Sequence, residues 1–160
     1  MTDVAAEGAG GKIVLATCYD ERFPPENATD GKSNTFWVTT GLYPQEIIVE
    51  FDRVTNVTRV TTTSVNVQKI IVEKSESKRP EKFEKAFEAE LPNNGLKPQT
   101  DTQQVTFRAK FLRVIIASGY EHFAALSKVA AISGDGAAAS EPVLDESRDS
   151  EESNEPEDSF

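Results

Sequence analysis

Oxygen-bearing side chains crowd one short segment of the chain, residues 24–35, which reads PPENATDGKSNT. Hard oxygen donors at this density, in a loop stiffened by two prolines, are what a structural Ca²⁺ site needs. In this interpretation the Asp30 carboxylate and the Thr35 hydroxyl bind the ion, together with the main-chain carbonyls of Asn27 and Lys32. The segment is not an EF-hand loop, because its glycine comes too early and no Glu stands at the far position.

The same residues have a simpler interpretation as an Asx turn. Asp30 would then accept hydrogen bonds from backbone N–H groups just after it in the chain, with no ion involved. Composition favours neither interpretation over the other.

Other side chains with chemical potential are isolated. The only histidine, His122, has no recognisable nucleophile beside it, and the single cysteine, Cys18, follows an apolar strand and is expected in the core or at its rim. Trp37 can stack on a sugar if it is exposed on a loop, but its neighbours Phe36 and Val38 favour a place in the core. No glycine-rich phosphate loop is present. We therefore expect no enzymatic activity.

Period-two alternation and β-branched residues predict that strands position these side chains. In the clearest case Ile47, Val49 and Phe51 share one face while Glu46 and Glu50 share the other. The segment 81–91 is ambiguous, since its Phe spacing also suits a helix, but its alternation favours a strand. The predicted strands are Phe36–Thr40, Pro44–Phe51, Val57–Ser64, Val67–Lys74, Glu81–Leu91, Thr102–Ala109, Phe111–Ser118 and Leu126–Ser133.

About eight short strands without alternating helices predict an all-β, antiparallel jelly-roll sandwich. The expected division is a flexible N-terminus over residues 1–11, a jelly-roll domain over 12–134, and a disordered acidic tail over 135–160.

The tail dominates the charge of the chain. It carries ten acidic residues and one basic, a net charge of −9, whereas residues 1–134 carry 17 acidic and 16 basic groups, a net charge of −1. A nearly neutral body offers no basic field for nucleic acid. We see no secretory signal and no apolar run long enough to span a membrane, and a lone cysteine fits a reducing compartment, so we expect a cytoplasmic protein.

A family resemblance appears in the pattern Pro-Glu-Asn-Ala-x-Asp-Gly-x-x-x-Thr-x-Trp, from Pro25 to Trp37. It resembles the signature of discoidin-type, galactose-binding-like domains, which are eight-stranded jelly rolls, many with one calcium ion. The longer string from Phe23 to Glu46 is similar to a narrower family, the small β-sandwich subunits of intraflagellar transport complex B. Further matches lie at residues 70–75, 111–116 and 122–124, so the resemblance spans roughly residues 12–134.

This resemblance implies a binding role rather than catalysis. The family forms a heterodimer with a Rab-like small GTPase subunit and works with other complex B subunits in the cytoplasm and in the cilium or flagellum. The family's calcium site, carried over, falls on Asn27, Asp30, Lys32 and Thr35, with a last contribution from Ser127. Many related domains have a Glu where this chain has Ser127, and a neutral donor there implies one structural ion rather than a calcium sensor.

Two alternatives stay open. A calcium-dependent carbohydrate-binding module would use the rim aromatics Phe23, Tyr43, Tyr120 and Phe123, but no cluster of Arg and His supports them, so sugar binding is not expected. An exposed apolar rim would instead indicate a protein interface. A small-heat-shock-like chaperone is the other alternative; against it, the chain has no Ile-x-Ile/Val motif near its C-terminus.

Overall fold

The computed structural model describes residues 2–40 and 42–134, and the predicted acidic tail lies outside these residues. Strands make up the fold, and two short 3₁₀ turns, η1 (Glu7–Ala9) and η2 (Pro25–Ala28), are the only helical pieces in the described ranges. Within the same ranges, no helix has the length and apolarity required to cross a bilayer. The prediction of an all-β fold is confirmed.

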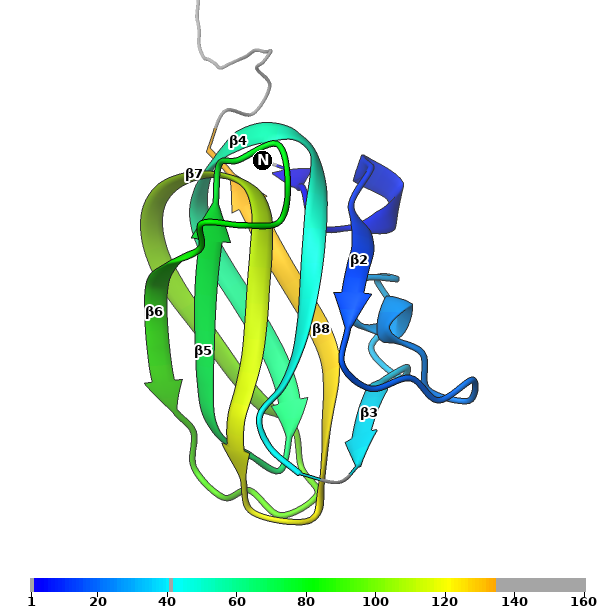
Figure 1. The fold of residues 1–160 in the computed structure, drawn as a ribbon. Helices are drawn as coiled ribbons and strands as arrows, with labels where there is room; N and C mark the ends of the chain where they lie inside the picture. The colour runs from blue at the N-terminus through cyan, green and yellow to red at the C-terminus, as the bar shows by residue number, and fades with distance from the viewer. Residues whose placement is uncertain (1, 41, 135–160) are drawn as a thin grey trace, which may run out of the picture.

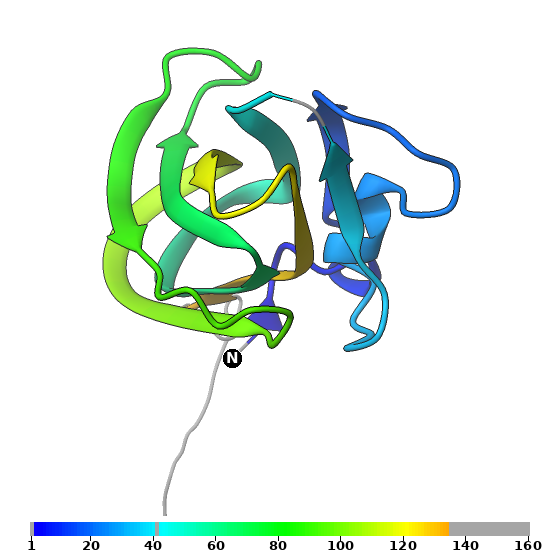
Figure 2. The same cartoon turned by 90° about the horizontal axis from the view of Figure 1, so that it is seen from below.

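Eight antiparallel strands form one hydrogen-bonded sheet that folds into two layers facing each other across the core (Figures 1 and 2). The first layer has the order β2–β4–β7–β5–β6 and the second has β7–β4–β8, with β1 and β3 both paired to the outer edge of β8. The strands are β1 (Thr2–Asp3), β2 (Lys12–Ala16), β3 (Trp37–Thr40), β4 (Gln45–Val65), β5 (Val67–Ser75), β6 (Glu84–Glu90), β7 (Gln99–Gly119) and β8 (Phe123–Ser133).

Two long strands, β4 and β7, run through both layers. The sequence predicts two strands over Pro44–Phe51 and Val57–Ser64, but these are the two halves of β4, joined across an irregularity between Glu50 and Thr55. Likewise, the two strands predicted around Lys110 are the halves of β7. Such bends let one strand change sheets without ending. The structure still has eight strands, because β1 and β2 precede the first predicted strand, Phe36–Thr40.

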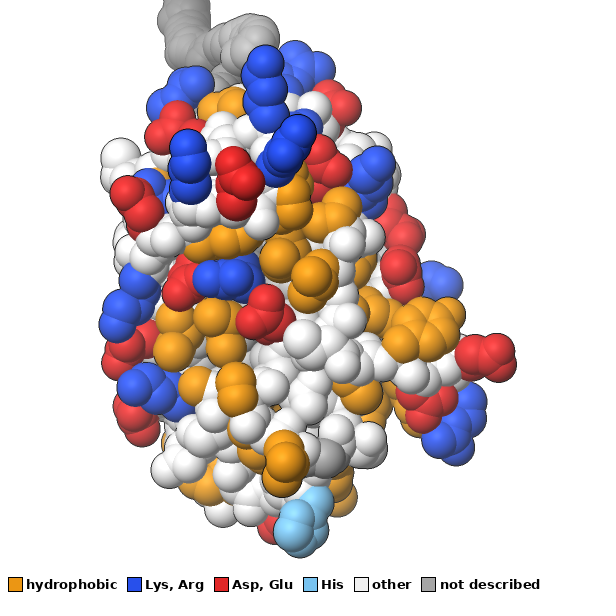
Figure 3. Space-filling view, in the orientation of Figure 1, with side chains coloured by type: hydrophobic (Ala, Val, Ile, Leu, Met, Phe, Trp, Pro, Cys, Tyr) orange, Lys and Arg blue, Asp and Glu red, His pale blue; other side chains and the backbone are white. Residues whose placement is uncertain are grey.

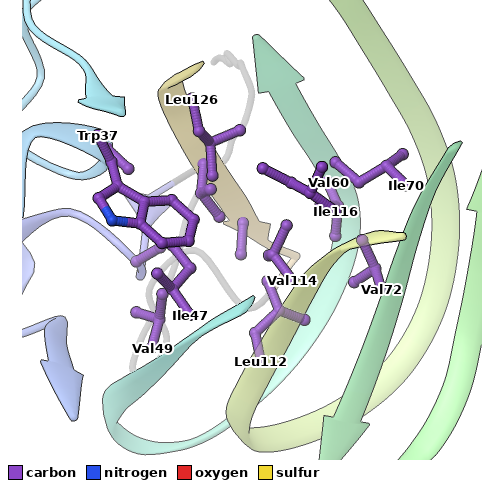
Figure 4. Packing of buried hydrophobic residues seen from close by; sticks show 14 of the residues in the cluster. Trp37, Ile47, Val49, Val60, Ile70, Val72, Leu112, Val114, Ile116 and Leu126 are labelled. Atoms are coloured by element: carbon purple, nitrogen blue, oxygen red, sulfur yellow. The ribbon is translucent and has the colours of Figure 1, made fainter. Parts of the chain in front are cut away.

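The core lies between the layers and contains the residues that the alternation predicts. Ile47, Val49 and Phe51 of β4 are buried, and they pack with Ile70 and Val72 of β5 and with alternate residues of β7 (Figure 4). The ambiguous segment 81–91 contains strand β6, so the preference for a strand there is confirmed.

The N-terminus differs from the flexible lead expected over residues 1–11. Thr2–Asp3 adds to the edge of β8, and Ala5 is fully buried. The Asp3 carboxylate accepts hydrogen bonds from the backbone N–H of Ala5 at 3.0 Å and of Ala131 at 2.9 Å. These bonds to a buried strand hold the segment in place, although its composition carries no strand signal.

Candidate functional site

The oxygen-rich segment is a loop anchored at both ends by buried side chains. At its start, Pro24 and Pro25 lead into η2, which buries Pro25 and Ala28. At its end, β3 begins with Trp37, which is fully buried and donates its indole N–H to the Cys18 carbonyl at 2.8 Å. The prediction that Trp37 fills the core is confirmed, so the indole is unavailable for stacking on a sugar.

Three of the predicted calcium ligands converge inside this loop. The Thr35 hydroxyl lies 2.7 Å from the Asp30 carboxylate and 3.3 Å from the Asn27 carbonyl oxygen. The side-chain amide of Asn27 donates to the Phe36 carbonyl at 3.0 Å, which orients the backbone at the same point. A carboxylate, a hydroxyl and a main-chain carbonyl therefore meet around one small volume.

The Asx turn is also present. The other carboxylate oxygen of Asp30 accepts the backbone N–H of Lys32 at 2.9 Å, across Gly31, whose φ of 80° favours glycine. The turn and the ion site are compatible, since Asp30 uses one oxygen for the turn and directs the other at Thr35.

Ser127 stands apart from the three converging ligands, although it lies across a shared pocket from the loop. It is the unpaired residue of a β-bulge, because Thr63 pairs with Lys128 while Ser64 pairs with Leu126. Its hydroxyl donates to the Thr63 carbonyl at 3.3 Å. Ser127 and Lys32 both line a pocket of about 260 Å³ between the loop and β8.

The donor set fits a hard cation of modest affinity. Ca²⁺ takes six to eight oxygen ligands, and this loop offers one carboxylate with several neutral oxygens. In the described part of the chain no three His, Cys, Asp or Glu residues gather as a metal site. Soft donors are also absent from the loop itself, which matches calcium better than a transition metal.

The two rim tyrosines tie loops together, whereas the other rim aromatics, Phe23 and Phe123, are exposed. The Tyr43 hydroxyl donates to the Glu121 carbonyl at 2.8 Å, and the Tyr120 hydroxyl donates to the Leu91 carbonyl at 2.5 Å. Burial, and secondarily the charge of Glu121, raises the pKa of the Tyr43 phenol. A side chain at Gly119 would meet the Tyr43 hydroxyl at 2.2 Å, so the two loops approach here as closely as a glycine allows.

Nothing at Cys18 or His122 resembles a catalytic pair. Cys18 is half-buried against the core, and its thiol lies 3.8 Å from the Val38 carbonyl. No hydrogen bond joins Cys18 to His122 among the described residues.

A feature that the alternation rule missed lies on the outer face of the first layer, where hydrophobic side chains surround charged ones (Figure 3). Ile47 and Val49 point into the core, so Ile48 between them points to the outer face. Ile48 is nevertheless buried. Next to it Arg113 donates to Glu73 at 2.8 Å through its Nε and lies 4.3 Å from the centre of the Phe83 ring. The sequence signal for this apolar outer face is the number of apolar residues at strand positions that alternation assigns to solvent.

Comparison with known proteins agrees with the all-β fold of the chain. Residues 12–129 match the F5/8 type C domain family. The chain is 49% identical over 135 residues to intraflagellar transport protein 25 of Chlamydomonas reinhardtii, covering 84% of this chain and 71% of that protein. It is 38% identical over 132 residues to the human intraflagellar transport protein 25 homolog, covering 81% of this chain and 90% of that protein.

Solved structures share the fold at low identity. A CBM32 module of Clostridium perfringens, in complex with GalNAc-β-1,3-galactose, superposes with a TM-score of 0.71 at 20% identity, over 82% of this chain and 100% of that module. Reduced XRCC1, bound to the catalytic domain of DNA polymerase β, reaches 0.66 at 12% identity, over 76% of this chain and 94% of that one. Sugar-bound and protein-bound structures share this fold, so the fold alone does not decide between the two roles.

Proposed function

Because the chain belongs to the F5/8 type C domain family and to the family of intraflagellar transport protein 25, we propose that it is a non-catalytic subunit of intraflagellar transport complex B. The 49% identity over most of the chain is the observation that carries the proposal. In this role the jelly roll is a rigid binding surface, and its place of action is the cytoplasm and the cilium or flagellum.

We propose a Rab-like small GTPase subunit as the direct partner, in a heterodimer that joins the other complex B subunits. A binding role is supported by the outer face of the first layer, where the half-buried Ile71 and Ile115 lie beside the Arg113–Glu73 pair. It is further supported by the rim, whose tyrosine hydroxyls are engaged in loop contacts instead of being free for a sugar.

The test is purification of the tagged full chain from a ciliated cell, with washing at high salt and identification of the bound proteins by mass spectrometry. We expect a near-stoichiometric Rab-like GTPase, with other complex B subunits in smaller amount. A tagged bacterial CBM32 module is the matched control, because it has the same fold without the family's sequence. Recovery of the chain without a GTPase would contradict the heterodimer.

A carbohydrate-binding module is the second candidate, favoured by the sugar-bound structure that shares the fold. It predicts binding on a glycan array that calcium enhances, and an isolated chain after purification from cells. Retention of a glycan by the purified chain, without a protein partner, would replace the proposed role with this one.

We further propose that one structural calcium ion binds the loop through the side chains of Asp30 and Thr35 and the carbonyls of Asn27 and Lys32. The convergence of Asp30, Thr35 and the Asn27 carbonyl within 3.3 Å supports this site. Ser127 of β8 is the neutral residue across from the loop, and it lines a pocket that Lys32 of the loop also lines. Bound calcium would supply a positive centre that holds the loop against the sandwich.

Terbium provides a direct test, since Tb³⁺ occupies calcium sites and emits when a nearby tryptophan is excited. Trp37, the only tryptophan in the chain, begins the strand that ends this loop. We expect sensitised Tb³⁺ emission that excess Ca²⁺ quenches, and that Asp30→Asn abolishes. Emission of equal strength from the Asp30→Asn protein would exclude this loop as the site.

A further inference from the structure

The outer face of the second layer carries hydroxyl groups and cations. Val60, Thr62 and Ser64 of β4 are buried and face inward. The residues that alternate with them, Arg59, Thr61 and Thr63, therefore face outward. Cross-strand hydroxyl pairs join Thr61 to Thr102 at 3.1 Å and Thr63 to Thr100 at 3.3 Å. Lys128 of β8 lies opposite Thr63 on the same face. We call the surface formed by Arg59, Thr61, Thr63 and Lys128 the basic face.

The cations of the basic face have few carboxylates to pair with. Arg59 is half-buried, and within residues 2–40 and 42–134 its guanidinium forms no ion pair. Lys128 and Lys32 line the pocket between the loop and β8. The one carboxylate in that pocket belongs to Asp3, and two backbone N–H groups already occupy it.

The chain leaves the described fold beside this face. Ile132 pairs with Arg59 across β8 and β4, and two residues later the N–H of Gly134 donates to the Asn56 carbonyl at 3.2 Å. Residues 135–160 follow, with ten acidic groups and one basic, a net charge of −9.

The reach of the chain is sufficient for its acidic residues to return to the basic face. The eleven residues 135–145 can span up to roughly 36 Å, whereas the six-residue step from Gly134 back to Lys128 covers about 20 Å. Every acidic residue from Asp145 onward can therefore reach Lys128, with chain to spare for the reversal.

We propose that the acidic segment, residues 141–158, docks on the basic face of its own chain, with carboxylates over Arg59, Lys128 and Lys32. Each exposed ion pair is weak, but the tether places the segment at an effective concentration of about 1 mM or more, so weak contacts are sufficient. Docking keeps other acidic segments from binding the basic face until a more basic surface binds the acidic segment instead.

A competing location is the connection between β5 and β6, where Lys78, Arg79 and Lys82 are exposed. Glu76 and Glu81 lie within the same connection and offset part of its charge. The connection also belongs to the first layer, whereas the acidic segment begins at the end of β8 in the second. Proximity and net charge therefore favour the basic face.

The first experiment compares amide NMR spectra of the full chain between about 0.01 M and about 1 M salt, over which the Debye length falls from roughly 30 Å to roughly 3 Å. The matched control is a full-length variant in which the ten acidic residues of 135–160 become Asn or Gln. We expect salt to shift the amides of Thr61, Thr63 and Lys128 in the native chain and not in the neutral-tail variant. Equal shifts in both, shifts confined to residues 78–82, or shifts that grow with protein concentration would overturn the proposal.

The second experiment removes the cations and measures how fast a Glu-specific protease cleaves the acidic segment at low salt. Because each exposed pair is worth a factor of roughly 1.4 to 5, the double variant Arg59→Gln/Lys128→Gln should be cleaved about 2- to 25-fold faster. Lys69→Gln/Lys85→Gln removes the same charge from β5 and β6, in the first layer, and should leave the rate unchanged. If Arg59→Gln prevents folding, Lys32→Gln/Lys128→Gln repeats the test at two exposed positions. Equal rates in the native chain and in the basic-face variant would refute docking.

Discussion

Replacing Asp30 with Asn tests the calcium loop, because it removes one charge and keeps the shape of the side chain. Without calcium, the amide oxygen can still accept the Lys32 N–H, and the lost interaction is the charge-assisted bond from Thr35 at 2.7 Å. The difference between a charged and a neutral hydrogen bond is about 1 kcal/mol, which corresponds to roughly 3–4 °C in Tm for a domain of this size.

Calcium should increase the difference in Tm between the native chain and the Asp30→Asn protein. At about 100 times its Kd the ion adds about 2.7 kcal/mol to the stability of the native chain, or roughly 10 °C in Tm. Asp30→Asn removes the only carboxylate of the site, so we expect its Tm to be the same in calcium and in chelator.

Differential scanning fluorimetry of both proteins, in calcium and in chelator, measures these four values. Asp20→Asn is the matched control, because Asp20 is an exposed carboxylate in the preceding connection, paired with Arg22 at 2.9 Å. It should keep the full calcium shift. If calcium raises the Tm of the Asp30→Asn protein as much as that of the native chain, the loop holds no calcium through Asp30 and only the Asx turn remains.

Three further predictions concern the packing and the pH dependence of the domain. Trp37→Phe opens a cavity and leaves the Cys18 carbonyl unpaired, so urea denaturation should show a loss of about 3 kcal/mol. Gln99→Leu should lose about 2–4 kcal/mol in the same assay, because the buried amide of Gln99 bonds both the N–H and the C=O of Val67. Burial raises the pKa of Asp3, so the folded state binds its proton more tightly than the unfolded state. Its contribution to stability is then greatest below pH 3.8 and is lost as the pH rises through the folded pKa, so Asp3→Asn should gain stability relative to the native chain between pH 3 and pH 7 in urea titrations.

The local alternation of apolar and polar residues predicts most strands, but it does not predict which of them are continuous with each other. The alternation of Ile47, Val49 and Phe51 depends only on neighbours along the chain, so the sequence predicts that face correctly. Whether two such strands are separate or continuous depends on the irregularity between Glu50 and Thr55, where composition suggests a loop. The order of the N-terminus depends on Asp3 bonding Ala131, a pairing that no local signal reveals.

In the candidate site too, contacts between residues close in the sequence were predictable, and contacts with a distant strand were not. Asn27, Asp30 and Thr35 lie within nine residues of one another, and the structure places the Thr35 hydroxyl beside the Asp30 carboxylate and the Asn27 carbonyl. Ser127 comes from a distant strand, and its hydroxyl bonds to the Thr63 carbonyl, a contact that depends on the register of β8 against β4.

The apolar outer face of the first layer escaped prediction for a different reason. Ile71 and Ile115 occupy positions that the alternation assigns to solvent, and they are in register with each other on β5 and β7. Phe83 covers the neighbouring Arg113 from the connection before β6, a contact that only tertiary structure creates.

Live imaging of the fluorescently tagged full chain in a ciliated cell tests the central claim most directly. A subunit of intraflagellar transport should appear as particles that travel along the cilium in both directions, together with a known complex B subunit carrying a second colour. Uniform diffusion of the tagged chain through the cell, while the second subunit moves normally, would contradict the assignment to intraflagellar transport.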